Sequence, residues 1–100
     1  MAVSFIARMS VKQDMEQAFI GHCQALEAAV RTEEPDCLYY KFYKLEEPLR
    51  YAVFESFTSH AAEQAHQASA HFKRIAPDLI ACLDGTYVRE YLHDLEGGGS

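Results

Sequence analysis

The 100-residue chain is short of residues that several classes of protein require. It has no tryptophan and no asparagine, and its nine lysine and arginine residues face 15 acidic ones, giving a formal net charge of −6. An acidic surface without a basic cluster repels a phosphate backbone, so we expect no nucleic-acid partner. No apolar run approaches the roughly 20 residues that span a bilayer, so we expect no membrane partner either.

Cysteine is also scarce, and its spacing excludes two further classes. Cys23, Cys37 and Cys82 form no CxxC pair, which argues against a disulfide framework and against a zinc knuckle. The N-terminal stretch MAVSFIARMS has neither a basic leader nor a long apolar segment. We therefore expect a cytoplasmic protein with reduced, mostly buried thiols.

What is present favours one globular domain. The hydrophobic fraction is 49%, and the 12 aromatic residues are six tyrosines and six phenylalanines. One hundred residues are enough for a single core but not for a second domain. We assign residues 1–94 to the domain and residues 95–100, which end in GGGS, to a flexible tail of native or cloning origin.

Apolar periodicity predicts six elements in the order β-α-β-β-α-β. The predicted strands are residues 2–9, 37–45, 50–57 and 86–93. The predicted helices are residues 12–31 and 59–82. This order is typical of the α+β, ferredoxin-like fold, a four-stranded antiparallel sheet with both helices on one face.

Local signals predict where the helices begin and break. Ser10 followed by Gln13 is a capping-box pattern, which predicts that the first helix starts there. In the second helical region we expect a break near Ser69 and another near Pro77, because proline lacks the N–H that a helix needs.

The two middle strands are apolar on both of their faces. Alternate residues of each strand should face opposite sides of the sheet, and helices on one side cover only one of these sets. The two sets in residues 37–43 are Leu38, Tyr40 and Phe42, and Cys37, Tyr39 and Tyr43. We therefore expect a homodimer in which the uncovered sheet faces pack together.

Three motifs carry a resemblance to a known family. They are EPDCLYYKFY (34–43), RYAVFESFTS (50–59) and EQAHQASAHFKRIAPDL (63–79). Together they resemble the antibiotic biosynthesis monooxygenase superfamily, the dimeric α/β-barrel group, and quinol monooxygenases in particular. The third motif, with Ala65, His66, Ser69, His71 and Phe72, is the most specific.

The resemblance implies the fold more firmly than the reaction. Members include cofactor-free oxygenases of quinols and aromatic polyketides, haem-degrading enzymes, isomerases of a phosphorylated quorum-sensing sugar derivative, and proteins without known activity. The haem-degrading members use a tryptophan, an asparagine and a late helical histidine. This chain has no tryptophan and no asparagine, and Ala76 stands at the position of that histidine, which argues against haem degradation.

The stretch HQASAHF places His66 and His71 five residues apart. On a continuous helix this spacing turns the side chains about 140° from each other, and no third ligand follows at a suitable spacing, so we expect no metal site. One alternative is that Ser69 caps a new helical segment and the histidines lie at its surface. The other is that a histidine lines a pocket and acts as a general base.

Other polar residues also allow two interpretations. Glu55, in the middle of an apolar strand, either pairs with Arg8, Arg50 or Arg89 or takes part in catalysis. His22, on the apolar arc of the first helix, is either a core residue or part of the same pocket. The candidate catalytic residues are His66, His71 and Glu55. The candidate substrate-binding residues are His22, Tyr40, Phe57 and Phe72.

These residues favour a cofactor-independent monooxygenase that acts on a quinol or another hydroxyaromatic compound. A histidine would remove a phenolic proton, and the resulting anion would pass an electron to O₂. Two alternatives remain open: an isomerase or tautomerase of a small carbonyl compound, and a non-catalytic small-molecule-binding dimeric module.

Overall fold

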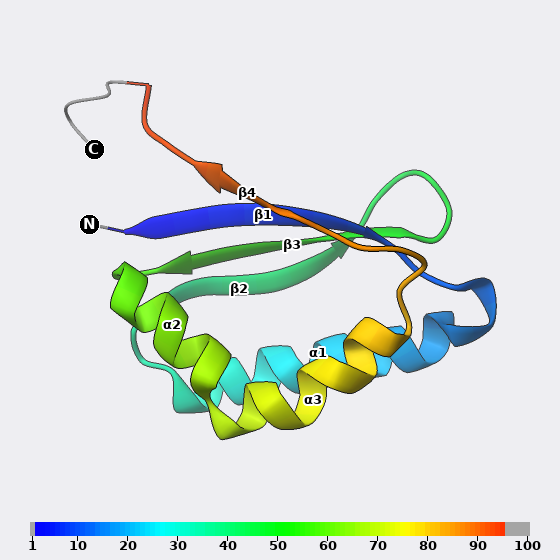
Figure 1. The fold of residues 1–100 in the computed structure, drawn as a ribbon, viewed down its shortest axis with the longest axis horizontal. Helices are drawn as coiled ribbons and strands as arrows, with labels where there is room; N and C mark the ends of the chain where they lie inside the picture. The colour runs from blue at the N-terminus through cyan, green and yellow to red at the C-terminus, as the bar shows by residue number, and fades with distance from the viewer. Residues whose placement is uncertain (1, 96–100) are drawn as a thin grey trace.

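The four predicted strands form one antiparallel sheet. The computed structural model describes residues 2–95, and in it the strands have the order β2-β3-β1-β4 (Figure 1). Their bounds are β1 Val3–Ser10, β2 Cys37–Lys44, β3 Arg50–Phe57 and β4 Arg89–Leu92. With the two helical regions between them, these strands confirm the ferredoxin-like α+β fold.

All helices lie on the same face of this sheet (Figure 1). They are α1 Glu16–Glu33, α2 His60–Ala68 and α3 Ala70–Ala81, with a short 3₁₀ turn at Gln13–Met15. The core forms where apolar side chains of α1 and α3 meet alternate residues of β1 and β3. Its centre includes Ala7, Met9, Phe19, Leu26, Val53 and Leu79. Across residues 2–95, no helix has both the length and the apolar character that a bilayer crossing requires.

Two predictions about where helices begin and end were wrong. Ser10 lies in β1, where its hydroxyl accepts a hydrogen bond from Arg50, so it cannot cap α1, which begins at Glu16. Strand pairing extends one residue further than the pattern suggested. Pro77 lies inside α3 without ending it. Proline in a helix frees the carbonyl four residues earlier, and here that carbonyl belongs to Lys73, whose exposed position allows water to satisfy it.

The predicted break at Ser69 is confirmed, and it sets the geometry of the site. Ser69 has an extended backbone (φ −67°, ψ 152°) and separates α2 from α3. Its hydroxyl donates to the carbonyl of His66 at 2.7 Å and accepts from the N–H of Phe72 at 3.2 Å. One side chain thus satisfies a backbone group of both helices, which fixes the angle between them.

The sheet face opposite the helices is uncovered (Figure 1). The strand register places Ile6 and Phe54 opposite each other on this face, with Lys41 on the other side of Phe54. Tyr39 and Tyr43 lie on it too, and each is 41% exposed. A mostly apolar face remains open in the single chain. Apart from Leu95, the predicted tail lies outside the described residues.

Candidate active site

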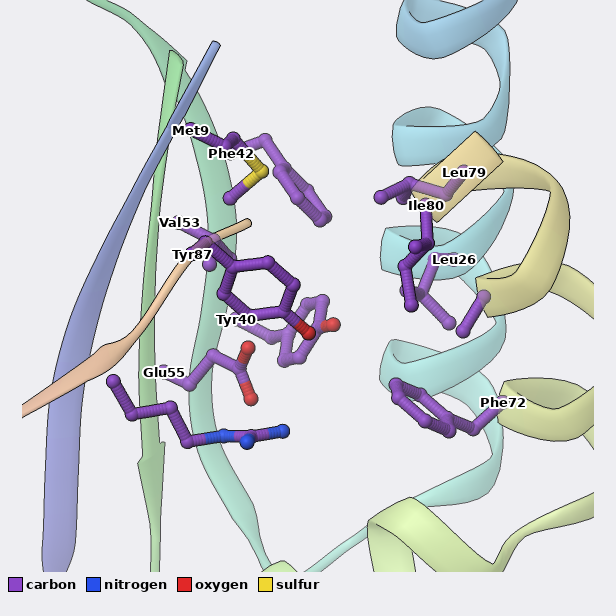
Figure 2. Close-up of a pocket in the computed structure, with 12 residues that line it drawn as sticks. Met9, Leu26, Tyr40, Phe42, Val53, Glu55, Phe72, Leu79, Ile80 and Tyr87 are labelled. Carbon is purple, nitrogen blue, oxygen red and sulfur yellow. The ribbon is translucent and has the colours of Figure 1, made fainter. Parts of the chain in front are cut away.

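A cavity lies between the sheet and the helices (Figure 2). Its volume is about 30 Å³, room for a water molecule or two. Apolar and aromatic side chains dominate its wall, and Glu55 and Arg89 are its charged groups. The lining residues are Met9, Leu26, Tyr40, Phe42, Val53, Glu55, Phe72, Ala76, Leu79, Ile80, Tyr87 and Arg89.

Glu55 is a carboxyl group held among apolar neighbours. It lies in the middle of β3, paired with Phe5 on one side and Tyr40 on the other, so its side chain faces the helices. Burial raises the pKa of Glu55 to about 8, and Arg89 opposes this rise, while the charges of Glu63 and Glu34 add to it. At pH 7 Glu55 is therefore mostly protonated and can donate a hydrogen bond.

His66 is buried at the edge of this cavity. It is 2% exposed, and its ring packs against those of Tyr40, Phe57 and Phe72, with centroids 4.8 to 5.3 Å apart. Its Nδ1 lies 2.9 Å from Oε2 of Glu34, at the end of α1. Its Nε2 has no hydrogen-bond partner within the described residues and lies 3.9 Å from Oε1 of Glu55.

These contacts fix the tautomer of His66. A carboxylate only accepts hydrogen bonds, so the Nδ1 that faces Glu34 carries the proton. Burial lowers the pKa of His66, against the raising effect of the Glu34 hydrogen bond, so the ring is neutral at pH 7. Nε2 therefore has a free lone pair, and it lies 3.9 Å from Oε1 of Glu55. A desolvated imidazole held in this way by a carboxylate is suited to accept a proton.

His71 lies on the other side of Glu34, away from the aromatic cavity. Its Nε2 makes a short hydrogen bond with Oε2 of Glu34 and lies 3.1 Å from the hydroxyl of Ser69. Glu34 thus bridges the two histidines. His66, His71 and Glu34 all line a second, outer pocket of about 210 Å³ that also includes Ser69 and Cys37.

The structure brings together most of the residues predicted from the sequence. Tyr40, Phe72 and Glu55 line the cavity, and Phe57 packs on His66 without lining it. His22 is half-buried on α1 and lines none of the pockets described here. Of the three arginines proposed for Glu55, Arg89 is the one that lowers its pKa, whereas Arg8 pairs with Glu90.

Sequence reasoning missed Glu34 as a site residue. Glu34 appears in the sequence analysis only within the motif EPDCLYYKFY, although a carboxylate just before Pro35, at the end of a predicted helix, could have marked it as a candidate site residue. The break at Ser69 brings both imidazoles to the same carboxylate, that of Glu34. Glu34 lies far from both histidines in the sequence, so ligand spacing along a helix could not reveal this cluster.

The comparisons with known proteins agree with this fold. The family model "Antibiotic biosynthesis monooxygenase" matches residues 2–78. The chain belongs to this family. The part of the chain that matches the family model includes the polar residues of the candidate site, Glu34, Glu55, His66 and His71.

Solved structures extend the similarity to nearly the whole chain. A proposed antibiotic biosynthesis monooxygenase of Caulobacter crescentus is 26% identical, with a TM-score of 0.88 over 94% of this chain and 90% of that one. A conserved protein of Methanosarcina mazei is 29% identical, with a TM-score of 0.82 over 91% and 90% of the two chains. A Mycobacterium tuberculosis protein, 23% identical with a TM-score of 0.85 over 95% and 96%, shares the fold. No curated protein matches the chain in sequence.

Proposed function

We propose that this protein is a cofactor-independent monooxygenase that acts on a quinol or another electron-rich hydroxyaromatic compound. The observation that carries the proposal is the unpaired Nε2 of the buried His66, 3.9 Å from Glu55 at the edge of an aromatic cavity. A buried nitrogen with no partner is costly unless a ligand satisfies it. The family and its relatives support the reaction class.

The first step is removal of a phenolic proton. A substrate hydroxyl about 2.8 Å from both Nε2 of His66 and the carboxyl of Glu55 fits between atoms that are 3.9 Å apart. His66 accepts the proton, and the carboxylate of Glu34 stabilises the imidazolium that forms. Protonated Glu55 donates a hydrogen bond to the phenolate oxygen, so it stabilises the anion rather than repelling it.

A quinol supplies all the electrons that the reaction needs. The phenolate passes an electron to O₂, and the two radicals combine at a ring carbon. Loss of water then leaves a hydroxyquinone. One oxygen atom enters the ring and the other leaves as water, so the four electrons that O₂ accepts all come from the substrate. An apolar wall around this step limits side reactions with water.

Substrate binding requires the cavity to widen. A benzene-sized ligand occupies a cavity of about 150 Å³, and the cavity measures about 30 Å³. Two of the lining residues reach the surface: Ile80 of α3, which is 45% exposed, and Tyr87, which is half-buried on the segment between α3 and β4. We propose that these two side chains move outward to admit the ring.

Oxygen uptake with a panel of hydroquinones tests the reaction. We expect uptake by the wild-type chain and a loss of roughly 10²- to 10⁴-fold in His66→Gln, with His60→Gln, an exposed histidine of the same helix, as the control. Isomerisation of a carbonyl compound without oxygen uptake would favour an isomerase or tautomerase that uses the same acid–base pair. Binding without turnover would favour the non-catalytic module. Either result would contradict the oxygenase.

We also propose that the protein is a homodimer that packs through the uncovered sheet face. Ile6, Phe54, Tyr39 and Tyr43 support this, because a neighbouring sheet would remove them from water. The three free thiols fit a reducing compartment, and we propose the cytoplasm.

A further inference from the structure

We propose that Glu34, His66 and His71 bind a divalent transition-metal ion such as Zn²⁺. One donor atom from each residue, an imidazole nitrogen or a carboxylate oxygen, lies within 4.8 Å of the other two. Two histidines and one carboxylate are a common protein ligand set for zinc and its neighbours in the first transition series. This inference is independent of the proposed oxygenase reaction.

The two imidazole nitrogens already lie next to the same carboxylate oxygen. Oε2 of Glu34 lies 2.9 Å from Nδ1 of His66 and in short contact with Nε2 of His71. Donor atoms around a tetrahedral zinc ion lie about 3.3 Å apart, so the ion requires the carboxylate to shift outward and the two imidazole rings, whose donor nitrogens lie within 4.8 Å, to adjust around it. The rigid part of the arrangement is the Ser69 break, which holds the two imidazoles on one side of the helix pair.

The surroundings favour a cation and provide access for it. All three ligands line the outer pocket of about 210 Å³, whose wall includes Glu33 and Asp36 but no lysine or arginine. Three protein ligands leave a fourth position open to water from this pocket. None of the three ligands lines the aromatic cavity, so the ion would lie outside the space proposed for the substrate.

The buried Nε2 of His66 provides the second observation. In metalloproteins the ring nitrogen that does not hold the metal usually donates its proton to a carboxylate or another acceptor. Nε2 of His66 has no partner within the described residues and lies 3.9 Å from Glu55, whose carbonyl oxygen can accept a hydrogen bond from a protonated Nε2 even when the carboxyl is neutral. When Nδ1 binds the metal, the ring proton moves to Nε2, and the unpaired atom becomes a donor.

This exchange changes what His66 presents to the cavity. Without metal, Nε2 is a proton acceptor, and with metal it carries a proton and can no longer act as a base. A metal ion bound at Nδ1 of His66 in the outer pocket therefore changes the protonation of Nε2 on the side of the ring that faces Glu55. If the oxygenase reaction is correct, Zn²⁺ inhibits it.

Zn²⁺ titration of the full chain, cleared of metal with a chelator, tests the site directly. We expect one Zn²⁺ per chain, with affinity reduced at least tenfold in Glu34→Gln and in His71→Ala. Glu33→Gln is the matched control, because it removes the same charge from the adjacent residue in the same pocket without removing a ligand. Equal affinity in all four proteins, or no binding, would overturn the proposal.

Nitrogen-15 spectra of the histidine rings test it without any substitution. On addition of Zn²⁺ to the wild-type chain, the ring signals of His66 and His71 should shift, and the proton of His66 should move from Nδ1 to Nε2. The signals of His22, His60 and His93 should stay unchanged. Shifts confined to those three histidines would place the ion elsewhere and contradict the proposal, whether or not the oxygenase reaction exists.

Discussion

Nε2 of His66, with its free lone pair, lies 3.9 Å from Oε1 of Glu55, a carboxyl that burial keeps mostly protonated at pH 7. Both groups are neutral at pH 7, and for Glu55 this is the reverse of the usual state of a glutamate. An imidazole is here the acceptor and a carboxylic acid the donor, as acid–base catalysis near neutral pH requires. The hydrogen bond to Glu34 orients the imidazole of His66, and the apolar wall of the cavity keeps Glu55 protonated.

The stability of the protein should depend on pH through Glu55. Its pKa is about 8 in the folded chain and about 4.5 when unfolded, so the unfolded chain releases this proton first. The contribution of Glu55 is fully present below pH 4.5, decreases as the pH rises, and is lost once the pH passes about 8. Since one pKa unit corresponds to about 1.4 kcal/mol, we expect a loss of roughly 5 kcal/mol in the free energy of unfolding across this window.

Urea unfolding of Glu55→Gln at several pH values checks this. Glutamine does not ionise, so the free energy of unfolding of the variant should fall less steeply with rising pH than that of the wild type. At pH 9 the variant should be the more stable of the two. Glu46→Gln, an exposed glutamate of the β2–β3 turn, should keep the wild-type slope. An unchanged slope in Glu55→Gln would show that Glu55 ionises normally.

Glu34 should act as a positioning residue for His66. Its hydrogen bond and its charge raise the pKa of His66 against the lowering effect of burial. In Glu34→Gln the amide oxygen can still accept from Nδ1, but the charge is gone, so the base is weaker. We expect a roughly tenfold lower rate and an acidic limb of the pH–rate profile that moves to lower pH. A rate loss without movement of that limb would indicate a structural role only.

Ser69→Ala should destabilise the fold by about 1–2 kcal/mol. The substitution removes a hydroxyl that caps α3 at Phe72 and also bonds the last turn of α2 at His66. Ser69→Thr keeps the hydroxyl and should be close to the wild type. Ser59→Ala, which removes the cap of α2 alone, gives the comparison for a single cap. The readout is the midpoint of urea unfolding, and equal stability of Ser69→Ala and the wild type would contradict the double role.

Phe54→Lys should dissociate the proposed dimer. Phe54 lies in the middle of β3 with Ile6 and Lys41 on either side, at the centre of the uncovered face. A charge there would be buried without a partner if two sheets packed together. Sedimentation should give twice the mass of the 11.3 kDa chain for the wild type and for Ala61→Lys, an exposed site on α2, and 11.3 kDa for Phe54→Lys. A wild-type monomer at micromolar concentration would refute the dimer.

The sequence predicted the fold well because the fold depends on strong, local patterns. Apolar alternation predicted the four strands, and the Ser69 hydroxyl predicted the break between α2 and α3. The prediction of a break at Pro77 was wrong because the carbonyl that this proline leaves without a partner belongs to Lys73, an exposed residue, and exposure is not evident from a linear pattern. The hydrogen bond between Glu34 and His66 was not predictable from spacing, since the two residues are 32 positions apart and the β2–β3 hairpin lies between them.

The break at Ser69 has a consequence for protein engineering. A continuous helix from His60 to Ala81 would gain backbone hydrogen bonds, and a stabilising design would tend to create it by replacing residues 68–70 with strong helix formers. Such a chain would turn His71 about 140° away from His66 and separate it from Glu34. Its free energy of unfolding would increase, but Glu34 would no longer bridge the two imidazoles and the outer pocket that they share would be lost. Substitutions in residues 66–71 that stabilise a continuous helix would therefore disrupt the proposed catalytic and metal-binding residues.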